Sequence, residues 1–469
     1  MWSRLGSRGL PIVLSLVALL LATPTPVPQR IVRVWTAARL AAASGDIVST
    51  QQALLVISSS ATWRVPLKAD AIRLALANGD GERALTLLDD PPAPKAPPAV
   101  VSCWRAHALA LVGRWAQSTA ELSAAGTEPC QSPLSLLSAL AREKVESGEN
   151  DEAVAILHGL VAIDPGRLED ASLLGACLLL EDLESALVML RLPGARGDPL
   201  AVELNEALRS VEKTDRTAVL TASGEVFLRH EMWALAAGSF RQLVALEPGS
   251  ASAHAYYGLA LGQSGQDGLP ELEAAAALDP SSSLAQSLLG LHWQQAGKAQ
   301  QAIPFLERAA VLDPESGAVV ASLAAAQAAT GDVQSALEGY RRAAELQPAD
   351  PVFWRMLASF SADREVELVE TGLPAARNAV ALDQRNPFGL ELLGTIHTLL
   401  GGRAVAERLL SRSVQLDPTS ASARLRYGLL LSSEGKTREA RAQLTAAAGL
   451  GGTDPDGVMA RRALAQLGG

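Results

Sequence analysis

Aromatic residues are scarce in this chain. They make up 4% of its 469 residues, whereas hydrophobic residues as a whole make up 48%. A core with so few large rings must be assembled mainly from Ala, Leu and Val. Closely packed helices satisfy this requirement, whereas the strands of a β-sandwich favour aromatic and β-branched residues. The composition therefore predicts an all-α protein and argues against a β-sandwich.

The residue patterns of common catalytic and metal-binding sites are also missing. The six histidines are scattered, and none belongs to an H-x-x-x-H or H-E-x-x-H pair. No Walker A loop, G-x-G-x-x-G fingerprint or G-x-S-x-G elbow occurs in the sequence. Three cysteines without a C-x-x-C pair are too few for a zinc site. We therefore expect no enzymatic activity, no cofactor and no bound metal.

Positive charge is not concentrated anywhere in the chain. The formal net charge is −10 and the sequence pI is about 5.3. Proteins that bind nucleic acid present a stripe or patch of Lys and Arg to the phosphates, and this sequence has none. We therefore expect no nucleic-acid partner.

What the chain does contain is a repeated unit of 34 residues, which is clearest over residues 283–348. Small residues at positions 8, 20 and 27 of the unit let two antiparallel helices approach closely, and a large residue at position 24 fills the remaining gap. A proline at position 32 ends the second helix. These residues are Gly290, Ala302, Leu306, Ala309 and Pro314 in one unit, and Ala324, Ala336, Tyr340, Ala343 and Pro348 in the next.

This pattern resembles the tetratricopeptide (TPR) repeat, a helix–turn–helix unit. The resemblance extends over about twelve repeats. It is strong from about residue 134 onward, and weaker but in phase from about residue 31. It implies an all-α, right-handed superhelical solenoid whose first helices line a concave groove. It also implies binding of peptides or protein partners rather than catalysis.

Glycines mark the turn inside the repeats. Each lies where the first helix of a hairpin must end, and a glycine takes the left-handed conformation there without the steric cost of a Cβ atom. The turn glycines are Gly45, Gly79, Gly113, Gly148, Gly265, Gly297, Gly331 and Gly435.

The repeat register breaks once, because 49 residues separate Pro199 from Pro248 where 34 are expected. The surplus falls in Leu200–Arg216, which has the spacing of one amphipathic helix. An unpaired helix cannot continue the alternation of first and second helices, so we expect a bend or boundary there. The predicted division is degenerate repeats over residues 29–199, an extra helix over 200–216, regular repeats over 217–453 and a capping helix over 454–469.

The capping helix is expected to close the end of the solenoid with one apolar face. Met459, Leu464 and Leu467 share this face, whereas Arg461 and Arg462 lie on the other.

The first 28 residues have the composition of a targeting segment. Arg4 and Arg8 precede an apolar run of 13 residues, Leu10–Ala22, and a proline-rich spacer follows. An uncleaved signal-anchor and a cleaved secretory signal both fit, and an internal hydrophobic helix is a third alternative. A membrane span needs about 20 apolar residues. In the first two cases the positive end stays in the cytoplasm, so the repeats are expected outside it, in the cell envelope.

Two of the three cysteines lie where the ends of one hairpin meet. Cys103 is near the start of one expected helix and Cys130 is just past the end of its partner, and antiparallel packing brings these two ends together. In an oxidising compartment they can form a disulfide, and the alternative is two buried thiols. Cys177 lies within an apolar helix and is expected to be a core residue.

The inferred groove of the two clearest repeats is small and apolar. Apolar residues at helix spacing are equally typical of the core between repeats, so both interpretations stay open. If exposed, this surface would suit the apolar face of a partner helix or an extended hydrophobic peptide. The candidate groove residues are Leu284, Leu288, Leu291, Ala318, Ala321, Ala325 and Ala328.

Some TPR proteins bind the acidic C-termini of chaperones through a clamp of Lys, Asn and Arg residues. The corresponding positions here carry Ser287, Leu291, Ser322, Val352 and Met356. None of these side chains can donate the charged hydrogen bonds that a carboxylate needs. Chaperone C-termini are therefore not expected to be partners.

We interpret the chain as a bacterial TPR solenoid of the cell envelope that contacts the membrane only through its N-terminal segment. The predicted function is a non-catalytic scaffold for protein–protein interaction. The alternative is a regulatory or assembly subunit of an envelope polysaccharide or secretion complex, which would have the same solenoid and differ only in its partner.

Overall fold

The computed structural model describes residues 64–77, 79–91, 94, 96–126 and 130–468. These residues form 24 α-helices and one π-helical turn, and no strand occurs among them. The predicted all-α fold is therefore confirmed. The expected targeting segment, Gly45 and the degenerate first repeat lie outside the described residues.

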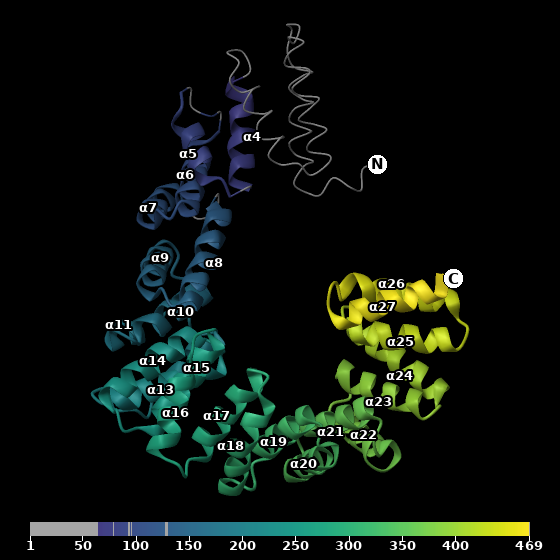
Figure 1. Ribbon diagram of the computed structural model, residues 1–469. Helices are drawn as coiled ribbons and strands as arrows, with labels where there is room; N and C mark the ends of the chain where they lie inside the picture. Colours follow the sequence, from purple (N-terminus) through teal and green to yellow (C-terminus); the bar gives the residue numbers. More distant parts are fainter. Residues whose placement is uncertain (1–63, 78, 92–93, 95, 127–129, 469) are drawn as a thin grey trace, which may run out of the picture. The chain divides into compact units, whose positions relative to one another are not determined.

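Most of the helices pair as antiparallel hairpins that follow one another along the chain (Figure 1). In the first half they are α4 (Arg64–Ala77) with α5 (Gly81–Asp89), α6 (Pro98–Leu111) with α7 (Trp115–Ala125), α8 (Gln131–Ser147) with α9 (Asn150–Ile163), α10 (Leu168–Leu178) with α11 (Leu183–Met189), and α13 (Arg216–Arg229) with α14 (Trp233–Leu246).

The second half continues in the same way. Its hairpins are α15 (Ala251–Gln263) with α16 (Leu269–Leu278), α17 (Ser283–Gln295) with α18 (Ala299–Leu312), α19 (Gly317–Thr330) with α20 (Val333–Leu346), α21 (Pro351–Arg364) with α22 (Leu373–Leu382), α23 (Pro387–Leu399) with α24 (Arg403–Leu416), and α25 (Ala421–Ser433) with α26 (Thr437–Leu450). The π-turn η3 (Leu368–Gly372) precedes α22, α12 (Pro199–Ala207) stands alone, and α27 (Pro455–Gly468) is the last helix. Within the described ranges, no helix is both long and apolar enough to span a bilayer.

The two helices of a hairpin approach each other as the repeat pattern predicts. A Cβ atom added at Gly290 would lie 2.6 Å from Cγ of Leu306, the large residue at position 24 of the same repeat. The same contact is present in the repeat that contains α10 and α11, where one residue is deleted between positions 8 and 24. A Cβ at Gly175 of this repeat would lie 2.7 Å from Cγ of Leu190. The deletion therefore shortens the first helix, which has 11 residues in α10 and 13 in α17, and leaves the small-to-large contact in place.

The expected turn glycines all take the left-handed conformation where they are described. Their φ values lie between +72° at Gly297 and +89° at Gly331. The expected prolines also mark helix ends: α18 ends at Leu312, two residues before Pro314, and α20 ends at Leu346, two residues before Pro348. Both predictions are confirmed.

The repeat over 351–386 is two residues longer than the 34-residue unit, and the π-turn η3 accommodates the additional residues. An α-helix that gains residues without a change in its packed face widens locally into i→i+5 hydrogen bonds. The side chain of Arg341 from the preceding hairpin fixes this turn, because its Nη2 atom donates to Oε2 of Glu367 (2.6 Å) and to Oγ1 of Thr371 (2.9 Å).

The extra helix is shorter than predicted. We expected one helix over 200–216, whereas α12 ends at Ala207 and turns connect it to α13. Leu204 and Leu208 are buried, as the amphipathic pattern requires, but Val202 is 48% exposed. The polar run Arg209–Asp215 has no apolar residue to bury except Val211, so it does not extend the helix.

The capping helix α27 packs on α25 and α26, but its buried face differs from the expected one in one residue. Leu464 and Leu467 pack against the cluster that contains Leu444, whereas Met459 is 51% exposed. Ala460 occupies the buried position instead and is fully inaccessible. A small residue fits there because α27 approaches the hairpin closely.

Contacts divide the chain into two compact units. The first comprises residues 1–248 together with 263–266, and the second comprises residues 249–262 and 267–469. The segment 200–216, where the sequence predicts a boundary, lies within the first unit. Whether the chain divides there in folding therefore stays a prediction.

We expect a fragment from Leu200 to Gly469 to fold alone into a soluble helical protein. It retains the whole second unit and the capping helix, and repeat stability is a sum of local terms. The fragment Gln29–Pro199 lacks a cap and should be less stable. Circular dichroism and thermal melts of both fragments test this, and an unfolded or aggregated Leu200–Gly469 fragment would show that the halves form one cooperative unit.

Candidate functional site

The candidate site lies in the first unit, where the unpaired helix α12 interrupts the hairpins. Asp198 caps α12 by accepting a hydrogen bond from the Ala201 backbone N–H (3.4 Å), and Pro199 occupies its first turn. Nδ2 of Asn205 donates to the Leu190 carbonyl (3.0 Å), which ties α12 to the end of α11. Helix α12 therefore packs against the preceding hairpin through both its apolar face and its polar side chains.

Charged side chains of helix α13 connect it to the end of α10 and to α12. Nη1 of Arg216 donates to the Leu179 carbonyl at the end of α10 (2.9 Å). At the other end of α13, Nε2 of His230 lies 2.7 Å from Oε2 of Glu203 on α12, and Arg229 pairs with the other oxygen of the same carboxylate. The hydrogen bonds from Arg229 and His230 lower the pKa of Glu203 below its ordinary value, so this group is ionised at neutral pH.

Helices α8 and α10 are joined by a buried carboxylate. Asp170 is 2% exposed and accepts hydrogen bonds from Ser138 on α8 and from Arg167. A buried charge is stable only when its oxygens are paired in this way. This contact fixes the spacing of the two helices that form one wall of the site.

A pocket of about 490 Å³ forms where these elements meet. Helix α14 packs against α8. The pocket is lined by α8, α10, the start of α12, the α13–α14 turn with the start of α14, and the end of α15. Regular repeats stack in order, so α8 and α14 would not meet without the unpaired helix between them. We call this cavity the α12 pocket.

The floor of the α12 pocket is apolar. Val145 and Leu173 are almost completely buried, and Leu200, Met232 and Trp233 are half-buried around them. Partly exposed Met and Trp side chains can repack around or stack on a ligand group without the cost of opening the core. The pocket can therefore accept an apolar group.

The rim of the α12 pocket is mostly acidic. Its charged residues are Arg142, Glu146, Glu169, Asp198 and Glu231, together with His230. Arg142 forms an ion pair with Glu169. Glu146 and Glu231 are exposed and make no ion pair with any described residue. With histidine counted as neutral, the lining carries four carboxylates against one guanidinium, a formal charge of −3.

Glu231 has a backbone conformation that favours glycine. Its φ is +57°, and it lies seven residues after Gly224, as the turn glycine Gly297 lies seven residues after Gly290. A non-glycine residue in this conformation costs about 1 kcal/mol or more. Glu231 is not among the site residues predicted from the sequence, and the signal that could have indicated it is the absence of a turn glycine in the repeat over 217–250.

The predicted groove residues lie in the second unit and contribute nothing to the α12 pocket. Leu288 and Ala321 are buried, so they belong to the core between repeats. Leu284, Leu291, Ala325 and Ala328 are partly buried and pack against the same cores, while Ala318 is exposed. Their role in partner binding stays a prediction.

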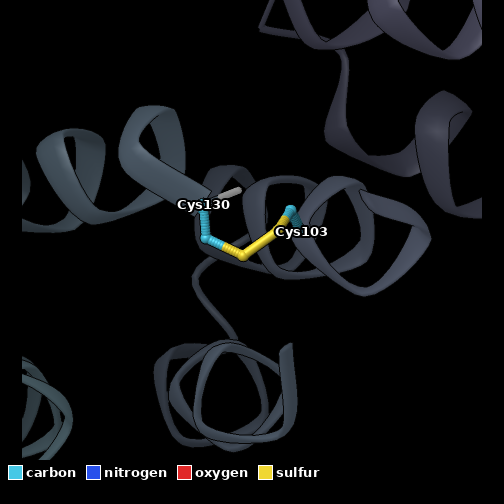
Figure 2. Close-up of a disulfide and its surroundings, with 2 residues drawn as sticks. All are labelled: Cys103 and Cys130. Atoms are coloured by element: carbon cyan, nitrogen blue, oxygen red, sulfur yellow. A yellow bond between two sulfur atoms is a disulfide. The ribbon is translucent and has the colours of Figure 1, made fainter. Parts of the chain in front are cut away.

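Cys103 and Cys130 form a disulfide, with their Cα atoms 5.1 Å apart (Figure 2). The bond joins α6 to the residue that precedes α8. Cys177 is fully buried, and burial raises the pKa of its thiol to about 12. Its thiol therefore stays protonated and unreactive at neutral pH.

A second buried carboxylate connects two hairpins of the second unit. Glu391 on α23 is 3% exposed, and it accepts hydrogen bonds from Ser422 and from Nε of Arg426 (2.9 Å) on α25. Burial raises the pKa of Glu391 above its ordinary value, although Ser422 and Arg426 oppose this shift. Because all of these groups lie between adjacent repeats, we assign them a structural role.

Comparison with known proteins agrees with the repeat pattern. Two family profiles described as tetratricopeptide repeat match residues 263–317 and 294–360. A search of curated proteins finds no match.

Among solved structures, the chain is similar to a TPR protein of Thermus thermophilus, with 23% identity over 40% of this chain and 98% of that one, at a TM-score of 0.34. It is also similar to yeast Tom70, with 15% identity over 94% of this chain and 96% of that one, at a TM-score of 0.40.

Proteins with this repeat typically mediate protein–protein interactions and are generally non-catalytic. The matched segment covers two of the clearest hairpins in the structure, α17 with α18 and α19 with α20. Residues 263–360 of this chain are therefore tetratricopeptide repeats.

Proposed function

We propose that this protein is a non-catalytic scaffold of the cell envelope that binds a protein partner at the α12 pocket. The observation that carries the proposal is the pocket itself. Its volume of about 490 Å³ lies within the range of roughly 300–1,000 Å³ that is typical of ligand sites. It combines a buried apolar floor with exposed charges, which is the arrangement that anchors a side chain and orients it.

The disulfide supports a location outside the cytoplasm. Disulfides persist in oxidising compartments such as the bacterial periplasm, whereas cytoplasmic thiols are kept reduced. Cys103 and Cys130 are both buried, so their bond has a structural rather than a catalytic role. This agrees with the localisation that Arg4, Arg8 and the run Leu10–Ala22 predict.

Site-specific photocrosslinking in living cells tests the proposal. A photoreactive amino acid at Leu200, which lines the pocket, is expected to form a covalent adduct with one envelope protein. The matched control is Val202 on the same helix, which is 48% exposed but does not line the pocket. The identity of the adduct would separate a general scaffold from an assembly subunit of a polysaccharide or secretion complex.

Two results would contradict the proposal. The first is that Leu200 gives no adduct in intact cells. The second is that Leu200 and Val202 give the same adducts in the same yield, since labelling would then reflect exposure of the helix rather than occupation of the pocket.

A further inference from the structure

The charge and shape of the α12 pocket indicate what kind of segment it binds. We propose that its ligand is a short segment of the partner in which a Lys or Arg side chain is adjacent to an apolar side chain. This inference rests on the proposed function, because it specifies the chemistry of the same site.

The charges of the rim determine whether a cationic or an anionic group of a ligand can bind there. Glu146 on α8 and Glu231 on the α13–α14 turn approach the pocket from different elements, and Asp198 adds a third carboxylate from the start of α12. The only guanidinium, that of Arg142, is already paired with Glu169. A cationic group that enters the pocket meets unpaired carboxylates, whereas an acidic group is repelled.

The arrangement of the carboxylates favours an organic cation over a metal ion. A metal ion needs several oxygen ligands at about 2.0–2.6 Å from one point. Nowhere in the described part of the chain do three or more His, Cys, Asp or Glu side chains gather closely enough for this. An ammonium or guanidinium on a long side chain can instead reach carboxylates that are spread around a rim.

The floor of the pocket adds the second requirement. Trp233, Met232 and Leu200 leave part of their apolar surface accessible beside the carboxylates. A cation alone would leave this surface in contact with water, whereas a neighbouring apolar side chain would cover it. The ligand therefore has to present both chemical groups within the reach of one pocket.

Fluorescence anisotropy with labelled peptides on the purified full-length chain tests this inference. The probe is an octapeptide of alternating lysine and leucine, compared with a glutamate–leucine and a lysine–serine octapeptide. We expect saturable binding of the lysine–leucine peptide, and at least about tenfold weaker binding of the other two.

Charge variants then locate the binding. We expect the double variant Glu146→Gln/Glu231→Gln to bind the lysine–leucine peptide about tenfold more weakly than the wild-type chain. The matched control is Glu143→Gln/Glu206→Gln, which removes the same charge from exposed positions of α8 and α12 that do not line the pocket. It should bind within about twofold of the wild type, and the melting temperature of both variants verifies that they fold.

Three outcomes would overturn the inference. They are equal binding of the glutamate–leucine peptide, an equal effect of the two double variants, and no saturable binding of the lysine–leucine peptide up to about 1 mM. A crosslinked partner at Leu200 together with any of these results would refute only the ligand chemistry. The absence of an adduct at Leu200 would refute the proposed function.

Discussion

Replacement of Cys103 and Cys130 by alanine is expected to destabilise the hairpins around α6–α8 by about 3.5 kcal/mol. The bond closes a loop of 27 residues in sequence, and the chain-entropy relation gives about this value for a loop of that length. The effect should be local, because a solenoid is stabilised repeat by repeat and the bond connects neighbouring hairpins.

Hydrogen exchange measured by mass spectrometry can resolve this local effect. Amides of α6 and α8 should exchange up to about 300-fold faster in the double variant, which corresponds to about 3.5 kcal/mol. The amides of the second unit should not change. The control Cys177→Ala removes the third cysteine and leaves the disulfide intact, so its α6 and α8 amides should keep the wild-type protection.

The same bond tests the proposed compartment. In intact cells we expect only the Cys177 thiol to be free, as shown by thiol alkylation after denaturation in acid. A chain without residues 1–28 should stay in the cytoplasm and give three free thiols, because cytoplasmic thiols are kept reduced. Three free thiols in the full-length chain in cells would contradict the envelope location.

The local features of the fold could be predicted from the sequence because each depends on residues close together in it. The turn glycines and the prolines after α18 and α20 act on their own helices. The contact of Gly290 with Leu306 joins residues only 16 apart within one repeat. These are constraints of backbone conformation and of side-chain volume, and both follow from residue type.

The α12 pocket could not be predicted, because it depends on how a break in the pattern is accommodated. The sequence places surplus residues at 200–216 but does not say that α14 packs against α8 as a result. Val145 and Trp233, which both line the pocket, are 88 residues apart and belong to no shared motif. Periodicity describes regular repeats, so it carries no information about an irregular contact.

The errors at the two irregular helices have the same origin. Val202 and Met459 satisfy a helical apolar spacing, yet both are exposed. Spacing identifies a face of a helix, but the width of the buried stripe depends on the neighbour that covers it. Regular hairpins show the same effect, since Val311 of α18 is 80% exposed, so spacing alone does not determine which apolar residues of a helix are buried.

Substitution of Gly290 by leucine is expected to destabilise its hairpin by about 1–3 kcal/mol. A Cβ atom at Gly290 would lie 2.6 Å from Cγ and 2.8 Å from Cδ2 of Leu306, and Leu306 is fully buried. The rest of a leucine side chain would have no space unless α17 and α18 moved apart. The measurement is thermal or urea unfolding of the full-length chain, followed by circular dichroism.

Gly449→Leu in α26 is the matched control. No atom lies within 4 Å of a Cβ built at Gly449, which is an exposed residue of a regular helix. Leucine has a higher helix propensity than glycine, so this variant should be neutral or more stable by up to about 0.8 kcal/mol. The opposite signs of the two substitutions separate close packing from the general effect of adding a side chain to a helix.

A double substitution tests whether Gly290 and Leu306 form one packing unit. Leu306→Ala alone should cost about 2–5 kcal/mol because it leaves a cavity in the hairpin. In Gly290→Leu/Leu306→Ala the new leucine occupies part of that space, so the total loss should be smaller than the sum of the single losses by about 1 kcal/mol or more. Additive losses, or an unchanged melting temperature for Gly290→Leu alone, would show that position 8 does not face position 24 and that the repeat register is wrong.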